Sequence, residues 1–199
     1  MNNLIKTFLL ALPFQISAFA QESPFNYNYL QAGYSTGTVT ASSNSYNTSS
    51  AGIGASIATS DSSFIIGGIS QGTLTVGSAS INLDNWSIGF GGHMGLSEKT
   101  DLVGSLSYLS NTLSQNGAWV RTTGYGFGAE IKHAISDKVE LFTGVGVSIT
   151  GDDRVQTTNF NLGGRYKISN NFSFGVGYAT ARNTTATSSG FGISGRLEF

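Results

Sequence analysis

The sequence contains no cysteine, and this absence excludes disulfide bonds, thiolate metal sites and a lipidated N-terminal cysteine. Charged residues are also scarce, at 11% of the chain, against about 25% in an average soluble domain. The 10 Lys+Arg and 11 Asp+Glu leave a net charge of −1, so nothing indicates a basic surface for a nucleic-acid partner. A soluble protein would need more charge than this on its surface.

Long apolar runs are missing as well. After residue 20 no run approaches the ~20 apolar residues that a membrane-spanning helix needs. Glycine, by contrast, accounts for 27 of 199 residues, and aromatic residues make up 12%. A membrane β-barrel accommodates these properties, because only every second residue of each strand faces lipid. The composition therefore favours a membrane barrel over a soluble protein or a helical membrane protein.

Residues 1–20 have the features of a secretory signal peptide. Lys6 supplies a positive charge, an apolar run follows, and the Ala-Phe-Ala of residues 18–20 forms a cleavage site. The run is too short to cross a bilayer as a helix, which makes an N-terminal anchor the weaker alternative. We expect cleavage after Ala20 and one barrel domain over residues 21–199.

Beyond residue 25 the hydrophobic pattern has a period of two. Trp119, Tyr125, Phe127 and Ile131, for example, are separated by even spacings, and glycines and Glu130 occupy positions between them. One face of such a strand is bulky and apolar, and the other is small or polar. The small face carries too little charge for a solvated surface, but it suits the narrow lumen of a barrel whose other face meets lipid.

Similar polar turns recur along the chain. The sequence LSEKTDL of residues 96–102 aligns with residues 135–141 and 168–174, and a shorter copy lies at residues 59–64. Between them lie longer polar segments that we expect to form outer loops, at residues 37–49, 77–85, 111–117, 150–157 and 182–188.

These turns and loops predict an all-β fold, a single up-and-down antiparallel transmembrane β-barrel of about ten strands. An even number of strands places both chain ends on the periplasmic side. Eight strands is the alternative, if the weak second and third strands merge into a loop. The ten expected strands lie near residues 28–36, 50–58, 63–75, 84–95, 101–110, 118–133, 139–149, 157–168, 172–181 and 189–199.

The last strand alternates apolar residues and finishes in an aromatic one, through Phe191, Ile193, Leu197 and Phe199. With the signal peptide and the alternating strands, this ending resembles small Gram-negative outer membrane β-barrel proteins. The resemblance implies localisation in the outer membrane, contact with its lipids, and recognition of these four residues by the barrel-assembly machinery. Ser194 departs from the pattern, which usually has glycine there. Because the family includes porins, adhesins, enzymes and structural barrels, the resemblance implies a place and a fold but no activity.

Aromatic residues near the strand ends predict two interfacial girdles. The outer girdle would contain Trp86, Tyr108, Trp119, Phe160 and Tyr178. The periplasmic girdle would contain Phe64, Tyr166, Phe172, Phe174 and Phe199.

Strand parity points most of the strand charges into the lumen, near its periplasmic end. Acids and bases are mixed there, which favours an ion-pair network that plugs the lumen. A charged constriction in a narrow pore for small solutes is the alternative. Higher in the lumen the inward positions are mostly glycine and serine, which would leave room for water or a slender ligand. The predicted lumenal network comprises His93, Asp101, Glu130, Lys132, Glu140, Arg165, Lys167, Arg196 and Glu198.

No catalytic, metal or cofactor site emerges from the sequence. His93 and His133 face opposite ways by parity, and the Asp152-Asp153 pair has no histidine predicted near it. No metal-ligand cluster or phosphate-binding loop appears. We therefore expect a non-enzymatic structural barrel or narrow passive pore. A barrel that binds a surface partner or a lumenal ligand is the second hypothesis, and an outer membrane hydrolase is the third.

Overall fold

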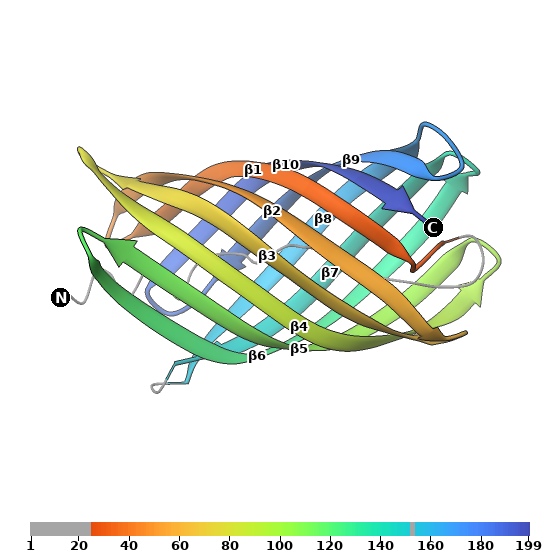
Figure 1. Cartoon of the computed structure of the whole chain (residues 1–199), viewed down its shortest axis with the longest axis horizontal. Helices are drawn as coiled ribbons and strands as arrows, with labels where there is room; N and C mark the ends of the chain where they lie inside the picture. Colours follow the sequence, from red (N-terminus) through yellow and green to blue (C-terminus); the bar gives the residue numbers. More distant parts are fainter. Residues whose placement is uncertain (1–24, 152–153) are drawn as a thin grey trace.

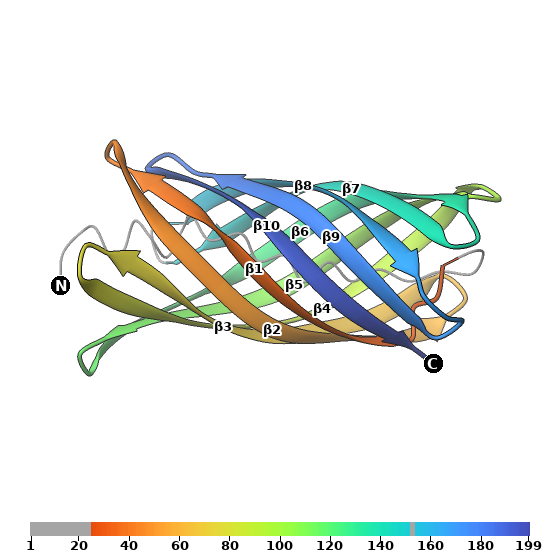
Figure 2. The same cartoon turned by 90° about the horizontal axis from the view of Figure 1, so that it is seen from above.

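The computed structural model describes residues 25–151 and 154–199, so the predicted signal peptide of residues 1–20 lies outside the described residues. Ten antiparallel strands form one closed barrel, in which each strand pairs with its neighbours in the sequence and β1 also pairs with β10. Figures 1 and 2 show this long barrel and its tilted strands from two sides. The prediction of an all-β, up-and-down barrel of ten strands is confirmed, and the eight-stranded alternative is excluded.

The strands differ in length but follow one another with short connections. Their bounds are β1 (Tyr29–Ala41), β2 (Asn44–Ser60), β3 (Ser63–Val76), β4 (Ala79–Ser97), β5 (Thr100–Gln115), β6 (Ala118–Ser136), β7 (Val139–Thr150), β8 (Val155–Lys167), β9 (Phe172–Arg182) and β10 (Ala186–Glu198). No helix in the described part of the chain is long and apolar enough to cross a membrane.

Tight turns connect the strands at both ends of the barrel. We call the end where β1 begins and β10 finishes the terminal end, and the opposite one the far end (Figure 1). The terminal-end turns lie within the polar segments that the sequence predicted. The predicted outer loops are too long, because the first three far-end connections have only two residues each. These connections are residues 42–43, 77–78 and 116–117.

Local conformation explains why these connections are short. Ser42 and Ser43 have φ of 50° and 66°, and Asn116 and Gly117 have φ of 50° and 82°. Two successive residues with positive φ form the hairpin turn that matches the twist of a β-ribbon. The flanking residues are rich in threonine, which favours strands. The polar composition thus suggested loops where the chain continues its strands.

Several strands are longer than a bilayer requires. β4 and β6 contain 19 residues each, about twice the ~9–11 residues of a tilted spanning strand. β9, on the opposite side of the barrel, contains 11. The barrel wall therefore extends beyond the bilayer, furthest along β2 to β6.

Large apolar side chains face outward in a belt around the barrel. Soluble proteins rarely expose so continuous an apolar surface, whereas a transmembrane barrel presents one to lipid. About half of each of these side chains is exposed, and every strand contributes at least one. A representative from each strand is Leu30, Ile53, Ile69, Phe90, Leu106, Phe127, Val145, Leu162, Val176 and Ile193.

Aromatic rings border the far edge of this belt. The ring centroids of Trp86 and Tyr108 lie 5.5 Å apart, and Tyr108 lies 5.6 Å from Tyr125. Two aromatic residues of the predicted girdles do not belong there. Phe64 is fully buried inside the lumen, and Trp119 lies six residues beyond Tyr125, next to a far-end turn.

Polarity is reversed beyond the belt. There the outward side chains of β1 are Thr36, Thr38 and Thr40, while the alternate residues Val39 and Ala41 are buried inside. An apolar core fills this part of the lumen, as it does in a soluble barrel. We call it the far apolar cluster; it comprises Val39, Ala41, Leu74, Ile81, Leu83, Leu113 and Ala186, with Tyr46, Val76 and Val120 packed against it.

Candidate functional site

Charged side chains from neighbouring strands meet inside the terminal half of the lumen. Arg165 on β8 donates a hydrogen bond from its Nη1 to Oε1 of Glu140 on β7 at 2.9 Å. Lys132 on β6 lies 4.0 Å from the same carboxylate oxygen. All three side chains are buried, so their charges are stabilised by each other instead of by water.

Gln31 on β1 joins two guanidinium groups of this region. Its Oε1 accepts hydrogen bonds from Nη2 of Arg165 at 3.3 Å and from Nε and Nη2 of Arg196 at 3.1 and 2.9 Å. The guanidinium of Arg196 also lies 3.9 Å above the ring centroid of Tyr29. Gln31 and Tyr29 were missed by the sequence argument, which considered only charged residues, although their odd positions on β1 share the inward parity.

The predicted lumenal residues divide into a buried group and a rim. Asp101, Glu130 and Glu198 are buried with the residues above, whereas Lys167 is half-buried at the end of β8. His93 is half-buried and stacks on an aromatic ring instead of joining the charges. We call the buried set the terminal cluster; it comprises Gln31, Asp101, Glu130, Lys132, Glu140, Arg165, Arg196 and Glu198.

Residues 25–28, which precede β1, fold into the terminal end of the barrel. The ring of Tyr27 stacks on Phe64 with centroids 5.1 Å apart and on His93 at 4.9 Å. Nζ of Lys132 lies 5.1 Å from the Tyr27 ring centroid. Burial raises the pKa of the Tyr27 phenol well above its usual range, and the negative charge of Asp101 adds to this effect, so Tyr27 stays neutral.

Hydrogen bonds fix the same segment to both neighbouring strands. Oδ1 of Asn28 accepts the backbone N–H of Ala58 at 2.9 Å, and the carbonyl of Asn28 accepts the N–H of Phe199 at 3.0 Å. The segment thus closes the terminal mouth with an aromatic stack. Phe25, Tyr27 and Tyr29 alternate with Asn26 and Asn28, so the period of two is already present in this segment of the sequence, but it does not show that the aromatic rings lie inside the lumen.

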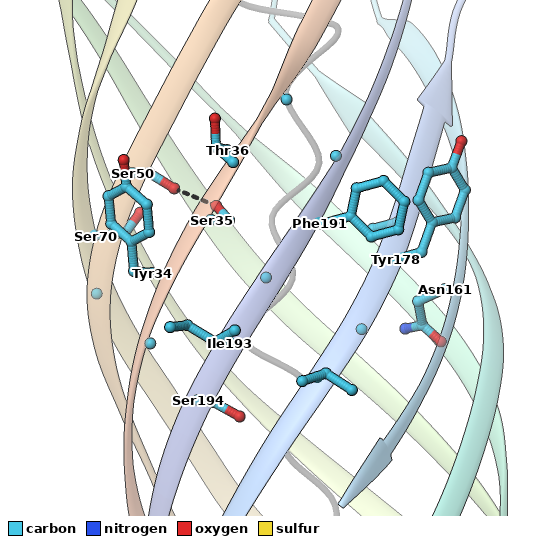
Figure 3. Close-up of a pocket in the computed structure, with 18 of the residues that line it drawn as sticks. Tyr34, Ser35, Thr36, Ser50, Ser70, Asn161, Tyr178, Phe191, Ile193 and Ser194 are labelled. Carbon is cyan, nitrogen blue, oxygen red and sulfur yellow. Dashed lines mark hydrogen bonds between the residues drawn. The ribbon is translucent and has the colours of Figure 1, made fainter.

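A cavity of about 190 Å³ lies in the lumen between the terminal cluster and the far apolar cluster. Its volume accommodates several water molecules or a small solute. Its polar lining includes Ser35 and Ser50, whose hydroxyl oxygens are 2.8 Å apart, together with Asn161 and Ser194 (Figure 3). Arg165 from the terminal cluster also lines it.

Glycine keeps the wall close-packed around this cavity. A Cβ added to Gly37 on β1 would lie 2.1 Å from the carbonyl oxygen of Ser189 on β10. A Cβ added to Gly52 on β2 would lie 2.7 Å from the carbonyl oxygen of Ile69. The glycine-rich inward face is therefore needed for the close approach of neighbouring strands as much as for lumenal space.

The arrangement offers no evident acid–base pair for catalysis. His133 faces outward, where its Nδ1 lies 2.9 Å from the hydroxyl of Thr100. His93 is held in the Tyr27 stack on the inner face. Among the described residues no group of three or more His, Cys, Asp or Glu side chains could hold a metal ion; Asp152 and Asp153 lie outside the described residues.

The residues of the predicted assembly signal all face outward. Phe191, Ile193, Leu197 and Phe199 are 67%, 51%, 49% and 64% exposed. They therefore form one lipid-facing row on β10 and just after it. Their recognition by the assembly machinery stays a prediction.

No protein-family model matches the chain, and no curated protein sequence matches it. Solved structures of low sequence identity are similar to it. The β-domain of the autotransporter BrkA from Bordetella aligns over 86% of this chain and 99% of that domain, with a TM-score of 0.59 and 12% identity. An outer membrane channel from Pseudomonas putida F1 aligns over 94% and 99%, with a TM-score of 0.53 and 11% identity.

The translocator domain of the autotransporter NalP from Neisseria meningitidis aligns over 86% of this chain and 88% of that domain, with a TM-score of 0.52 and 14% identity. At these identities the likeness shows the fold alone. The fold is that of outer membrane β-barrels, and the apolar belt provides the lipid-facing surface that this location requires. The chain therefore has the fold of an outer membrane β-barrel.

Proposed function

We propose that this protein is a structural barrel of the outer membrane whose lumen is closed at rest. One observation carries the proposal: fully buried side chains occupy the lumen at both of its ends. Val39 and Leu74 at the far end, and Phe64 and Asp101 at the terminal end, are each 0% exposed. Side chains that line a water-filled pore would retain exposed area, so a permanently open passive pore is disfavoured.

The proposed orientation follows from the chain ends and the wall length. The terminal end would face the periplasm, as the chain ends of even-stranded barrels do. The longer β2 to β6 wall would then extend outside the cell and present a surface of threonine, serine and asparagine side chains. The outward row of Phe191, Ile193, Leu197 and Phe199 is the proposed contact with the assembly machinery, and membrane lipids surround the belt.

Single-channel recording of the refolded protein in a planar bilayer tests this proposal. Folding is verified first, by the difference in gel mobility between heated and unheated samples. We expect no stable conductance steps. Ion-selective steps that change in Glu130→Gln or Arg165→Gln would instead assign a passive pore with its constriction in the terminal cluster.

A lumenal ligand is the second candidate function, and the cavity beside Arg165 favours it. A small polar solute there could hydrogen-bond to the Asn161 amide and the Ser35 hydroxyl. The test compares unfolding midpoints of the wild type and Ser194→Leu, which fills the cavity, across a panel of small polar solutes. A binder would stabilise only the wild type. If no solute raised the unfolding midpoint of the wild type more than that of Ser194→Leu, this candidate function would be ruled out.

A further inference from the structure

We propose that the outer face of β6 beyond the lipid-facing belt binds the phosphorylated sugar headgroup of an outer-leaflet glycolipid. The proposal rests on Trp119 and Arg121, two outward residues that the structural and pore hypotheses leave unused. Trp119 is 64% exposed. The guanidinium carbon of Arg121 lies 5.8 Å from the centroid of the Trp119 ring.

The position of Arg121 relative to the belt identifies what it meets. It lies four residues beyond Tyr125, whose ring contacts Tyr108 in the far aromatic border. Four residues of a strand tilted by about 45° advance about 9 Å along the barrel axis. A phospholipid headgroup layer is only about 5–7 Å thick, taken as half the difference between the whole bilayer and its hydrocarbon core. A larger headgroup, such as a phosphorylated sugar, reaches the level of Arg121.

The side chain of Arg121 is held in place but keeps donors for a ligand. Its Nε donates to the hydroxyl of Thr112 on the neighbouring β5 at 3.2 Å. Within the described residues no carboxylate lies at salt-bridge distance from Arg121, since the two salt bridges found there both involve Glu140. The Nη groups remain available to a phosphate, which a guanidinium binds in a bidentate manner.

Charge is distributed unevenly around the far part of the barrel. Among the described strand residues of β6 to β9, the outward charges beyond the belt are Arg121 and Arg182, both exposed. Arg182 lies four residues beyond Tyr178, at the same height above its girdle residue as Arg121. On β4 the corresponding charge is Asp84, which pairs across the sheet with Thr112. The described strand charges therefore favour an anionic headgroup beside Arg121, on the edge of β6 away from Asp84.

The chemistry of the pair matches a sugar phosphate better than phosphate alone. An indole presents a broad apolar face with a polar N–H at its edge, and the apolar face of a pyranose ring can pack against it. Arg121, two residues away on the same face, would bind the phosphate. The belt below supplies the surface for the acyl chains, so one glycolipid molecule would contact both regions continuously.

The experiment uses Trp119 as its own reporter. Trp86 is the second tryptophan of the chain, so Trp86→Phe leaves Trp119 as the single indole fluorophore. This protein is refolded into phosphatidylcholine liposomes, into the same liposomes with phosphatidylglycerol, and into the same liposomes with lipid A, a bisphosphorylated glucosamine lipid. We expect a blue shift of emission and protection from iodide quenching with lipid A only.

Variants then separate specific binding from general attraction. Arg121→Gln should weaken the apparent affinity for lipid A about tenfold, the effect of losing a charge-assisted hydrogen bond. Lys138→Gln, in a terminal-end turn, is the matched control and should change nothing. An equal emission shift with phosphatidylglycerol, or an unchanged lipid A titration in Arg121→Gln, would overturn the proposal. Native mass spectrometry of co-purified lipid A gives the same comparison without fluorescence.

Discussion

The terminal and far halves of this barrel use the same alternation with opposite polarity. In the terminal half, Ile69 and its counterparts face lipid while Glu140 and Arg165 form a buried ion pair inside. In the far half, Thr75 faces outward while its neighbour Leu74 is fully buried in the lumen. The difference follows from the surroundings, because each strand places apolar groups against lipid where there is lipid and inside the barrel where there is water.

The lumen of the far half should tolerate a charged side chain less well than the lumen of the terminal half. Val39→Asp places an unpaired carboxylate within the far apolar cluster, and we expect it to lower the free energy of unfolding by more than about 4 kcal/mol. Urea titration monitored by gel mobility measures this. The control is Thr38→Asp, one residue away and facing outward, which should change it by less than about 0.5 kcal/mol. Similar losses in both variants would contradict the claim that the far half is apolar inside and polar outside.

The terminal half should depend on its buried ion pair. Glu140→Gln leaves the guanidinium of Arg165 without its 2.9 Å carboxylate partner, and we expect a loss of about 3 kcal/mol. Glu98→Gln, in an exposed terminal-end turn, is the control. The double variant Glu140→Met with Arg165→Met should recover much of the stability, because it removes both buried charges. A double variant that is less stable than Glu140→Gln would refute this reading of the pair.

On the outer surface the order should be reversed: the lipid-facing belt should tolerate a charge less well than the outer face of the far half. Ile65→Arg places a charge on the lipid-facing belt, four residues deeper than Ile69 and its cross-strand partner Trp86, and should cost about 2–3 kcal/mol in liposomes. Thr75→Arg, ten residues along the same face of β3, should cost about 0–1 kcal/mol because it lies in water. Equal costs would mean that the belt extends over the whole barrel. Unfolding in liposomes of one defined lipid provides the comparison.

Glycine sharpens the contrast between the inner and outer faces. Gly37→Ala forces a Cβ against the carbonyl oxygen of Ser189, and we expect it to cost about 1–2 kcal/mol. Gly104→Ala faces outward, where an added Cβ meets nothing within 4 Å, and should be near neutral. If the two variants had equal unfolding midpoints, close strand approach at Gly37 would not be limiting.

Strand parity accounts for what the sequence could predict. It placed Glu130, Glu140, Arg165 and Arg196 on the inner face, because residues two apart share a face of a strand. It could not show which of them pair, since that depends on the register between strands. Gln31 escaped attention because the argument followed formal charge, although its amide oxygen is what joins the two arginines.

The far half could not be predicted from composition. Threonine, serine and asparagine are frequent both in loops and on water-facing strands. The polar composition of residues 37–49 therefore could not distinguish the expected loop from the far ends of β1 and β2 that these residues form. Phe64 begins a run of three apolar residues, which hides its parity, and its burial depends on Tyr27, on Val103 and on the space that Gly91 leaves for its ring. Trp119 follows the outward parity, but its height above the belt depends on the length of β6.

Cysteine accessibility on intact cells tests the reversed interior most directly, because the chain has no cysteine of its own. Single variants Leu74→Cys and Thr75→Cys are exposed to a membrane-impermeant maleimide, with Ile69→Cys as the lipid-facing reference. The account predicts rapid labelling of Thr75→Cys and protection of the other two until the protein is denatured. Labelling of Leu74→Cys as fast as Thr75→Cys would contradict it and would mean that the far lumen is open to water.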